Sequence, residues 1–329
     1  MTSQTSASVR SIVEDLDCEV EFDAPIGTEM TWYRVGGRAD VLVRPRSVEA
    51  LCTLTRRCRE FGTTIRVLGS GANLLVADEG VDGVVVHLDQ PIFREVSTIH
   101  RHRVHRAGVE GRAGDAVRVM AGKSLEQLVI STATQGLSGI ECMAGVPASV
   151  GGAIRMNAGG KYGCIGDAVA AVGCINLKGD LVVHEAHDLT FEYRRCSIID
   201  PIILWAELAL TPDDPDKTHK RVKEIFAEKK QTQPLAASSA GCAFRNPLAA
   251  DGSGRYLSAG ELIDRAGLKG LTIGGATISE RHANFFTAEK GATAGDLIEL
   301  MEHAASVVAD RLGYELVREV VVWRRGRGQ

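Results

Sequence analysis

The sequence predicts an α+β protein built from more than one domain. Strand and helix patterns alternate between residues 21 and 89, whereas short strands of period two dominate residues 90–212. Helices and short strands are mixed in the last third. The chain of 329 residues is long enough for about two or three domains. We therefore divide it into a loosely ordered N-terminus (1–20), two subdomains (21–89 and 90–212), a C-terminal domain (217–323) and a tail (324–329).

Turn and cap signals define the first subdomain. The stretch TWYRVGGRADVLVRP indicates two strands joined at Gly36-Gly37, where glycine permits a bend. Ser47 is a suitable N-cap for a helix over residues 48–61. TIRVL then predicts a buried strand that runs into Gly69-Ser70-Gly71, and LLVADEGVDGVVVHL predicts two short strands around a turn.

The middle region is predicted to form short strands at AVRVMAG, VGCINLKGDLVV and IILWAELAL, with one helix near SLEQLVISTATQG. A polar stretch with proline at 211–217 marks the next boundary. After it we expect a charged helix over 218–230, a short helix at ELIDRAG, and strands at LTIGGATIS, NFFTA and YELVREVVVW. Thr293 to Leu312 is the clearest helix, because Thr293 and Asp296 resemble a capping box and Gly313 follows the last turn.

Composition argues against several classes of protein. Hydrophobic residues make up 44% and charged residues 24% of the chain, as in ordinary globular proteins. A net charge of -4 and 5% aromatic residues argue against a nucleic-acid-binding module. No apolar run approaches the ~20 residues of a membrane span, and the N-terminus lacks the apolar region of a signal peptide.

The eight cysteines show neither a CxxC pair nor the paired spacing of a zinc site. We expect free thiols in a reducing cytoplasm and no metal site. His100, His102 and His105 lie in HRHRVHR, where the first two can share a strand face. Metal chelation and an exposed basic hairpin both fit this segment, and the lack of an acidic or thiol partner nearby favours the hairpin. The same holds for His184 and His187.

Two glycine-rich loops are candidate ligand sites. Gly69-Ser70-Gly71 follows a strand, but Leu74 and the strand-prone LLV exclude the strict Rossmann fingerprint, which opens a helix. This loop is either a simple turn or a source of backbone N–H groups for a diphosphate. The second loop, AGVPASVGGAIRMNAGG at 144–160, either admits a flat ligand to close range or is a tightly packed turn region. Two such loops together indicate one long nucleotide.

Several motifs in a fixed order resemble a known family. They are YRVGGRAD (33–40), LGSGANLLVADEGVDGVVV (68–86), GIECMAGVPASVGGAIRMNAGG (139–160), FEYRR (191–195), AGCAFRNP (240–247), ISERHANFF (278–286) and YELVREV (314–320). Together they resemble the UDP-N-acetylenolpyruvoylglucosamine reductase (MurB) family over nearly the whole chain after residue 20. DPDKTHKRVKEIFAEKK, between residues 194 and 242, holds no tyrosine, so the chain is similar to the shorter, second type of that family.

The resemblance implies a two-subdomain FAD-binding unit of the vanillyl-alcohol-oxidase (PCMH) type and a C-terminal α+β domain that covers the substrate. The implied activity is the reduction of UDP-N-acetylenolpyruvoylglucosamine to UDP-N-acetylmuramate in peptidoglycan precursor synthesis, with FAD and NADPH as cofactors. We accordingly expect a cytoplasmic enzyme that is a monomer or weak oligomer and has no nucleic-acid or membrane partner.

The resemblance also implies three catalytic residues, Arg194, Cys242 and Glu319. Arg194 would hold the charge of a developing enolate with paired N–H donors. Cys242 would protonate the α-carbon, because a thiol with an ordinary pKa of about 8.5 is mostly protonated at neutral pH. Glu319 would orient the substrate carboxylate or a chain of waters. Cys242 and Cys196 stand where the family usually has serine, which leaves open the supporting hydrogen bond expected at Cys196.

Ligand-binding residues follow from the same motifs. We expect substrate contacts from Tyr193, Asn246, Arg281, His282 and Asn284, although residues 281–286 equally fit the edge of a β-hairpin. We expect FAD contacts from Arg34, Gly36, Gly69, Ser70, Gly71, Asn73, Leu74, Gly145, Ser149, Val150, Gly151, Gly152 and Asn157.

Other interpretations of these residues stay open. Taken alone, Cys242 fits a core thiol and Arg194 fits a surface ion pair. The whole chain also fits another FAD-dependent oxidoreductase of the same fold, such as an alcohol or lactone oxidase, or a UDP-sugar-binding protein without activity. The sequence has no motif for a histidine-linked flavin, which disfavours the first, and it retains Arg194 and Glu319, which disfavours the second.

Overall fold

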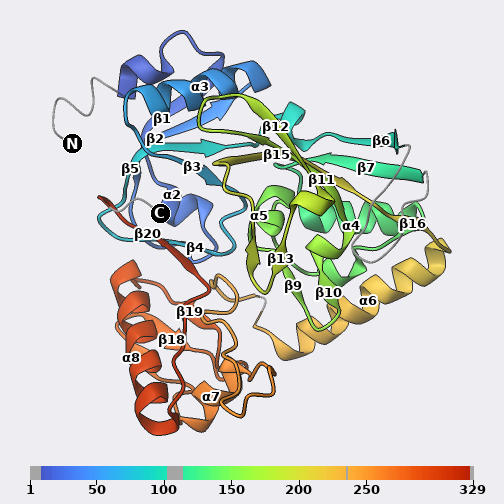
Figure 1. Cartoon of the computed structure of the whole chain (residues 1–329). Coiled ribbons are helices and arrows are strands. Elements are labelled where there is room, and N and C mark those ends of the chain that lie inside the picture. The colour runs from blue at the N-terminus through green and yellow to red at the C-terminus, as the bar shows by residue number, and fades with distance from the viewer. Residues whose placement is uncertain (1–8, 102–113, 235, 327–329) are drawn as a thin grey trace. The chain divides into compact units, whose positions relative to one another are not determined.

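The computed structural model describes residues 9–101, 114–234 and 236–326. The chain forms two compact units, whose elements are labelled in Figure 1. The first unit consists of residues 1–22, 40–70 and 83–228, and the second of residues 23–39, 71–82 and 229–329. His102 and His105 of the predicted histidine hairpin lie outside the described residues. None of the described helices combines the length and the hydrophobicity needed to cross a bilayer.

The first unit contains a small α/β layer, which confirms the predicted alternation of strand and helix. Its four-stranded sheet has the order β1-β2-β5-β3. The hydroxyl of Ser47 caps helix α3 by accepting a hydrogen bond from the N–H of Ala50. The elements are β1 Cys18–Ala24, β2 Ala39–Pro45, α3 Val48–Glu60, β3 Ile65–Leu68 and β5 Val81–His87.

The N-terminal segment is more ordered than its sequence indicates. Residues 9–13 are helical, and Val9 and Ile12 are 1% and 0% exposed in the core of the first unit. Two apolar side chains three positions apart share one face of a helix, so they can be buried together. The expectation of a loosely ordered segment over residues 1–20 is therefore wrong for residues 9–20.

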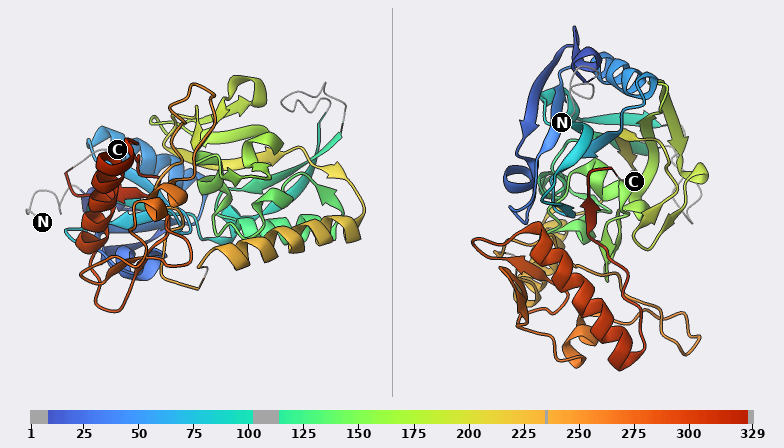
Figure 2. Two further views of the ribbon diagram at one scale, coloured as in Figure 1. Left: turned by 90° about the horizontal axis from the view of Figure 1, so that it is seen from below. Right: turned by 90° about the vertical axis from the view of Figure 1, so that its left-hand side faces the viewer.

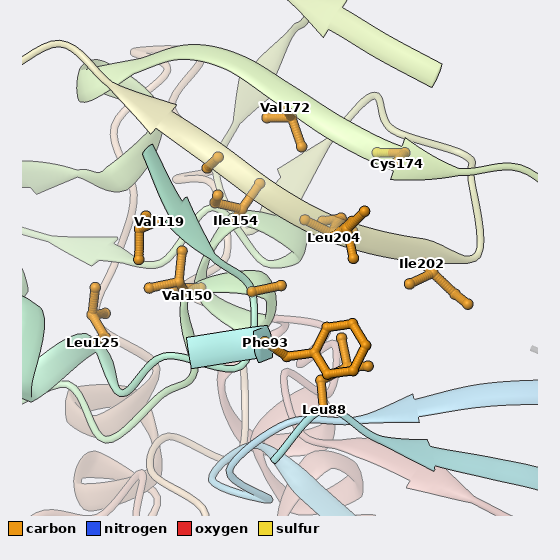
Figure 3. Close-up of a cluster of buried hydrophobic side chains, with 14 of the residues drawn as sticks. Leu88, Phe93, Val119, Leu125, Val150, Ile154, Val172, Cys174, Ile202 and Leu204 are labelled. Carbon is orange, nitrogen blue, oxygen red and sulfur yellow. The ribbon is translucent and has the colours of Figure 1, made fainter. Parts of the chain in front are cut away.

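A five-stranded antiparallel sheet forms the larger layer of the first unit, in the order β12-β11-β15-β7-β6. The central strand β11 is buried throughout, whereas the edge strand β12 alternates between exposed and half-buried positions. Figure 3 shows side chains of this sheet packed with Phe93, Leu125 and Val150 in one core. The elements are β6 Val96–Arg101, β7 Gly114–Met120, β11 Val169–Ile175, β12 Leu181–Glu185, β15 Ile202–Leu208, α4 Leu125–Thr134 and α5 Val150–Arg155.

Helix α6, Pro215–Thr232, confirms the predicted charged helix and begins three residues earlier than expected. Proline is favoured at the first position of a helix, which explains the earlier start. Thr218 is buried, and its hydroxyl donates to the carbonyl of Ala133 at 2.9 Å. The remaining short elements of the first unit are η1 Pro91–Arg94, β8 Leu137–Ser138, η2 Glu141–Met143, β9 Gly159–Gly160, β10 Gly163–Cys164, η3 Ile165–Ala168, η4 Ala186–Asp188, β13 Phe191–Glu192, β14 Arg195–Cys196 and β16 Thr211–Pro212.

The second unit is built around its longest helix, α8 Ala294–Leu312, which packs on a three-stranded sheet of order β17-β18-β19 (Figure 2). The rings of Phe244 and Phe286 meet edge to face in its core, with centroids 5.7 Å apart. A parallel pair, β4 with β20, completes the unit. The other elements are α2 Ile26–Met30, β4 Leu74–Val76, α7 Ala259–Arg265, β17 Thr272–Ile273, β18 Ala276–Ile278, β19 Phe286–Ala288 and β20 Val321–Trp323.

Two predicted strands of the second unit are wrong or too long. The segment TWYRV does not form a strand, because helix α2 and a turn precede β2. The predicted strand at YELVREVVVW is a strand only from Val321 to Trp323. Residues 317 and 318 pair instead with Arg245 and Phe244 through single backbone contacts. The alternating apolar residues of this segment therefore indicate an extended backbone, but residues before Val321 do not form a continuous series of strand hydrogen bonds.

The predicted capping box of α8 is confirmed. The Thr293 hydroxyl accepts from the N–H of Asp296 at 3.0 Å, and the Asp296 carboxylate accepts from the N–H of Thr293 at 2.9 Å. Gly313 ends the helix with a φ of 73°, in the left-handed region that glycine tolerates.

We expect Thr293→Ala to lower the free energy of unfolding by about 1 kcal/mol, because it removes one half of this capping box. Urea unfolding followed by circular dichroism measures the change. Thr293→Ser keeps the hydroxyl and serves as the control. Equal stability of the alanine variant and the native chain would show that the cap contributes nothing.

Candidate functional site

The two glycine-rich loops of the first unit meet. The hydroxyl of Ser70 donates to the carbonyl of Pro147 at 2.7 Å. An added Cβ on Gly69 would lie 2.6 Å from Oγ of Ser149, closer than real Cβ contacts allow. An alanine at position 69 would therefore have to turn the Ser149 hydroxyl away from the N–H of Gly152, which that hydroxyl caps at 3.3 Å. The two loops inferred from the sequence are thus in contact in this unit.

Backbone donors on these loops fall into two groups. Val150 and Gly151 donate to the carbonyls of Lys123 and Ala121, each at 2.9 Å, and Gly152 donates to Ser149. Within the hydrogen bonds of the described residues, the N–H groups of Gly69, Ser70 and Gly145 have no protein acceptor. Backbone donors of this kind can bind the diphosphate of a dinucleotide, so this part of the loops fits FAD. The N–H groups of Val150, Gly151 and Gly152 are already used by the fold.

Arg194 lies in the two-residue turn between β13 and β14, where Glu192 pairs with Arg195. Its φ of 57° is in the left-handed region, which a non-glycine residue rarely adopts. Its Nη1 donates to the carbonyl of Gly159 at 2.8 Å, and its guanidinium lies 5.3 Å from the centroid of the Tyr193 ring. The backbone turn and these two contacts fix the direction of the cation.

The glycine-rich loop and the Arg194 hairpin are joined by Asn157, which is 5% exposed. Its Nδ2 donates to the carbonyl of Glu192 at 2.8 Å, and its Oδ1 accepts from the N–H of Gly166 at 3.1 Å. Both ends of the amide are thus engaged by the protein, and a direct FAD contact stays a prediction that these bonds do not support. Asn157 instead positions the hairpin of Arg194.

The thiol of Cys196 makes a hydrogen bond of the kind that the resemblance leads us to expect from a serine. Its Sγ donates to the carbonyl of Arg155 at 3.4 Å. The guanidinium of Arg155 in turn donates to the carbonyl oxygens of Ile198 and Asp200, at 2.7 and 2.5 Å. A hydrogen bond at position 196 is therefore present, and it ties the end of the Arg194 hairpin to α5.

Sequence reasoning missed a contact that anchors the neighbouring hairpin of β9 and β10. Tyr162 and Lys161 occupy its turn, and both bind the carboxylate of Glu228 on α6. This hairpin carries Gly159, the acceptor for Arg194. No spacing in the sequence pointed to Glu228, because residues 162 and 228 are far apart in the chain and meet only through the fold.

Cys242 and Glu319 lie on adjacent backbone segments of the second unit. Cys242 forms an isolated antiparallel bridge with Phe285. The next residue, Ala243, donates its N–H to the carbonyl of Asn284 at 2.8 Å and accepts the N–H of Glu319 at 2.8 Å. The segment of Cys242 is therefore held from both sides. The backbone segments of two of the three predicted catalytic residues are thus adjacent, and Arg194 belongs to the first unit.

Tyr33 is a neighbour of this segment that sequence reasoning did not single out, although it begins the motif YRVGGRAD. Its side chain is 0% exposed. Burial raises the pKa of Tyr33, and the nearby Cys242 adds to the effect. The phenol therefore stays neutral at physiological pH and packs in the core of the second unit.

Most residues of this unit that were predicted to bind FAD are buried or contact other parts of the protein. A Cβ added to Gly36 would lie 1.9 Å from the carbonyl oxygen of Val76. A Cβ added to Gly71 would lie 2.0 Å from the carbonyl oxygen of Met30. Leu74 is 6% exposed within β4. Asn73 donates from Nδ2 to the carbonyl of Glu319 at 3.2 Å. Arg34 is exposed, with a φ of 56°. Among these, Arg34 has the most accessible side chain.

The predicted substrate residues of the second unit also have partners within the protein. Asn284 is 2% exposed and pairs through both ends of its amide with the backbone of Phe244. Arg281 donates to the carbonyls of Lys230 and Gln231 at the end of α6. Substrate contact by these two residues stays a prediction, and their geometry favours a role in holding the backbone.

The side chains of His282 and Asn246, two more predicted substrate residues, also form hydrogen bonds with the protein backbone. Burial lowers the pKa of His282, whose Nδ1 accepts from the N–H of Asn284 at 3.2 Å. A neutral imidazole fits this position, because Nδ1 must be unprotonated to accept. Oδ1 of Asn246 accepts from the N–H of Ala259 at the start of α7, at 2.9 Å. Nε2 of His282 is the end of this imidazole that suits a ligand, and substrate contact by Asn246 stays a prediction.

Comparison with known proteins identifies the family. A family model described as an FAD binding domain matches residues 39–184, and one described as the C-terminal domain of UDP-N-acetylenolpyruvoylglucosamine reductase matches residues 233–323. The chain belongs to the UDP-N-acetylenolpyruvoylglucosamine reductase family. A reductase of that name from Desulfosudis oleivorans is 40% identical over 311 residues, covering 92% of this chain and 94% of the relative. One from Moorella thermoacetica is 37% identical, covering 94% and 95%.

A solved structure supports the same assignment. The reductase (MurB) from Thermus caldophilus is 34% identical, with a TM-score of 0.73 and coverage of 93% of this chain and 99% of that one. These matches confirm the expected fold class, an α+β protein with an FAD-binding unit and a C-terminal domain of the MurB type. They also confirm the expected enzyme class, an FAD-dependent oxidoreductase.

We expect Gly69→Ala to weaken FAD binding by about tenfold, because the added methyl group displaces the Ser149 hydroxyl from the Gly152 N–H that it caps, at a cost of about 0.5–2 kcal/mol. The ratio of absorbance at 450 and 280 nm and the quenching of added FAD measure the loss. Gly295→Ala is the control, since its added Cβ would find the nearest atoms at an ordinary 3.4 Å. Equal FAD affinity in both variants would contradict the role given to Gly69.

Proposed function

We propose that the chain reduces UDP-N-acetylenolpyruvoylglucosamine to UDP-N-acetylmuramate, with FAD as bound cofactor and NADPH as reductant. The observation that carries this proposal is the backbone hydrogen bond between Glu319 and Ala243, which places the segment of a candidate proton donor beside that of a carboxylate. We also propose a cytoplasmic monomer or weak oligomer whose domains follow the boundaries inferred from the sequence.

The loops of the first unit would bind the cofactor through the free N–H groups of Gly69, Ser70 and Gly145. FAD, when bound and reduced, supplies the hydride that the β-carbon of the enolpyruvyl double bond accepts. Arg194 would then hold the negative charge that moves onto the substrate carboxylate. Its guanidinium stays cationic throughout and is already directed by Gly159 and Tyr193.

Cys242 would donate its thiol proton to the α-carbon, and the thiolate would regain a proton from solvent. This completes the addition of one hydride and one proton across the double bond. Glu319 would orient the substrate carboxylate or a water beside Cys242. The short bonds on both sides of Ala243 support this assignment, because a proton donor must hold its position to within a fraction of an ångström.

The direct test of the proposed function is the oxidation of NADPH, followed at 340 nm, on addition of the enolpyruvyl substrate. We expect purified protein to be yellow, NADPH to bleach it, and the substrate to restore the colour. Rapid reoxidation by oxygen with an alcohol as substrate would assign the chain to an oxidase instead.

We expect Cys242→Ser to retain measurable turnover, since the hydroxyl also carries a proton, and Cys242→Ala to lose about a hundredfold or more in overall reduction. Both variants are expected to accept electrons from NADPH at the native rate, as followed by flavin bleaching. Cys52→Ala, at a half-buried thiol on α3, controls for general effects of thiol loss. Native turnover in Cys242→Ala would falsify the donor assignment.

We expect Arg194→Lys to lower kcat by about a hundredfold, because a lysine cannot present paired N–H donors to a carboxylate. Arg195→Lys is a matched control in the same hairpin, where the side chain is 76% exposed. The comparison uses steady-state kinetics, with thermal melting to check folding. Similar kcat values for the two variants would remove Arg194 from the mechanism.

A further inference from the structure

A cysteine, a histidine and an aspartate converge in the first unit on residues that the proposed reaction does not use. Cys174 lies on β11, His184 on β12, and Asp200 just before β15. The Sγ atom, one ring nitrogen and one carboxylate oxygen of these residues all lie within 4.8 Å of one another. Nε2 of His184 and Oδ2 of Asp200 are 2.6 Å apart.

The sheet register brings the three side chains together. In the antiparallel pair of β11 and β12, Val172 faces His184 and Cys174 faces Val182. Side chains two positions apart on a strand point to the same face, so Cys174 and His184 are diagonal neighbours on one face. Cys174 also pairs with Ile203 of β15. Asp200 lies just before β15, so this pairing brings the segment of Asp200 close to Cys174.

The three groups differ in burial in a way that suits an ion. Cys174 is 0% exposed and shares the core with Val172 and Ile202 (Figure 3). The side chains of His184 and Asp200 are 27% and 12% exposed. The sulfur is therefore closed to solvent, whereas the imidazole and the carboxylate are partly open to it.

We propose that Cys174, His184 and Asp200 bind a divalent transition-metal ion of the zinc type, with a water as fourth ligand. Thiolate, imidazole and carboxylate are the ligands that zinc prefers. One thiolate and one carboxylate together balance the double charge of the ion, so the occupied site is neutral in a largely buried setting. Tetrahedral coordination needs donor atoms about 3–4 Å apart, so the side chains must adjust by about 1 Å.

The surrounding charges affect the strength of the site. Burial raises the pKa of Cys174 to about 12, and the charge of Asp200 adds to this. The thiol is therefore protonated without a metal, and binding must release its proton. Arg155 acts in the other direction on the thiol, because its cation favours the thiolate. Its guanidinium is held by the carbonyl oxygens of Ile198 and Asp200 and lies outside the ligand set.

A bound ion would join three segments that are otherwise linked by backbone bonds and the pair of His184 with Asp200. One of them, residues 197–201, continues directly from the hairpin that carries Arg194. The proposed site is thus a structural metal site that would crosslink these segments next to the hairpin of Arg194. Its existence does not depend on the proposed reaction. Metal that binds only the folded chain also raises the melting temperature.

The test is a titration of the FAD-loaded full chain with zinc chloride, after removal of metal by a chelator. We expect one zinc per chain by calorimetry and mass spectrometry, tighter binding as pH rises from 6 to 8, and a higher melting temperature. Cobalt(II) in place of zinc is expected to give the near-ultraviolet absorption of a thiolate ligand.

Variants locate the site. Cys174→Ser is expected to lose the thiolate absorption, and His184→Gln and Asp200→Asn to weaken zinc binding by about tenfold or more. The last two positions are partly exposed and keep the test valid if Cys174→Ser does not fold. Cys52→Ser and the double variant His100→Ala/His102→Ala are controls and should bind as the native chain does. Unchanged binding in His184→Gln and Asp200→Asn, binding lost only in the histidine control, or no zinc bound at all would overturn the proposal.

Discussion

The close contact between the two glycine-rich loops of the first unit is the constraint from which its site geometry follows. A Cβ at position 69 would lie 2.6 Å from Oγ of Ser149, so a side chain there would displace that hydroxyl. Ser149 also caps α5 by accepting the N–H of Gly152. Helix α5 ends at Arg155, whose carbonyl accepts the thiol of Cys196. The position of the Arg194 hairpin is therefore set through a chain of contacts that begins where the loops touch.

Buried amides supply much of the order around the candidate site. Asn157 in the first unit and Asn284 in the second are almost fully buried, and each bonds backbone groups with both ends of its amide. An unpaired amide at such a position would cost free energy, so pairing is what burial demands. Polar residues inside small-residue motifs were assigned to ligands from the sequence. In the structure both of them hold backbone segments near the candidate site residues.

Regular elements with strong local signals were predictable. Helices α3 and α8 follow from their caps, and the hairpin of β11 and β12 follows from two apolar runs around a polar turn. The hairpins of β9–β10 and β13–β14 were not, because two-residue strands carry no periodic signal. Residues 31–38 have a strand-like composition but form turns, since glycines at 36 and 37 pack against backbone with no room for a side chain.

Some features of the candidate site could likewise be predicted from the sequence, and others could not. The motifs placed Cys242 and Glu319 on segments that the fold makes adjacent, and they placed Gly69 and Ser149 in loops that touch. Contacts that depend on sheet register or on a distant helix carried no sequence signal. The group of Cys174, His184 and Asp200 is an example, because its spacing matches no metal motif and only the pairing of β11 with its neighbours brings the residues together.

The cysteine at position 196, where the resemblance leads us to expect serine, has a physical consequence for the hairpin. A thiol reaches the carbonyl of Arg155 at 3.4 Å, whereas a hydroxyl donor prefers about 2.7–2.8 Å. A serine in the same backbone would therefore leave this bond long, and the hairpin would have to move toward α5 to shorten it. Since Arg194 is two residues away and fixed by Gly159 at 2.8 Å, such a shift would strain that contact. The larger sulfur thus allows the β14 backbone to sit farther from α5 while both contacts are kept.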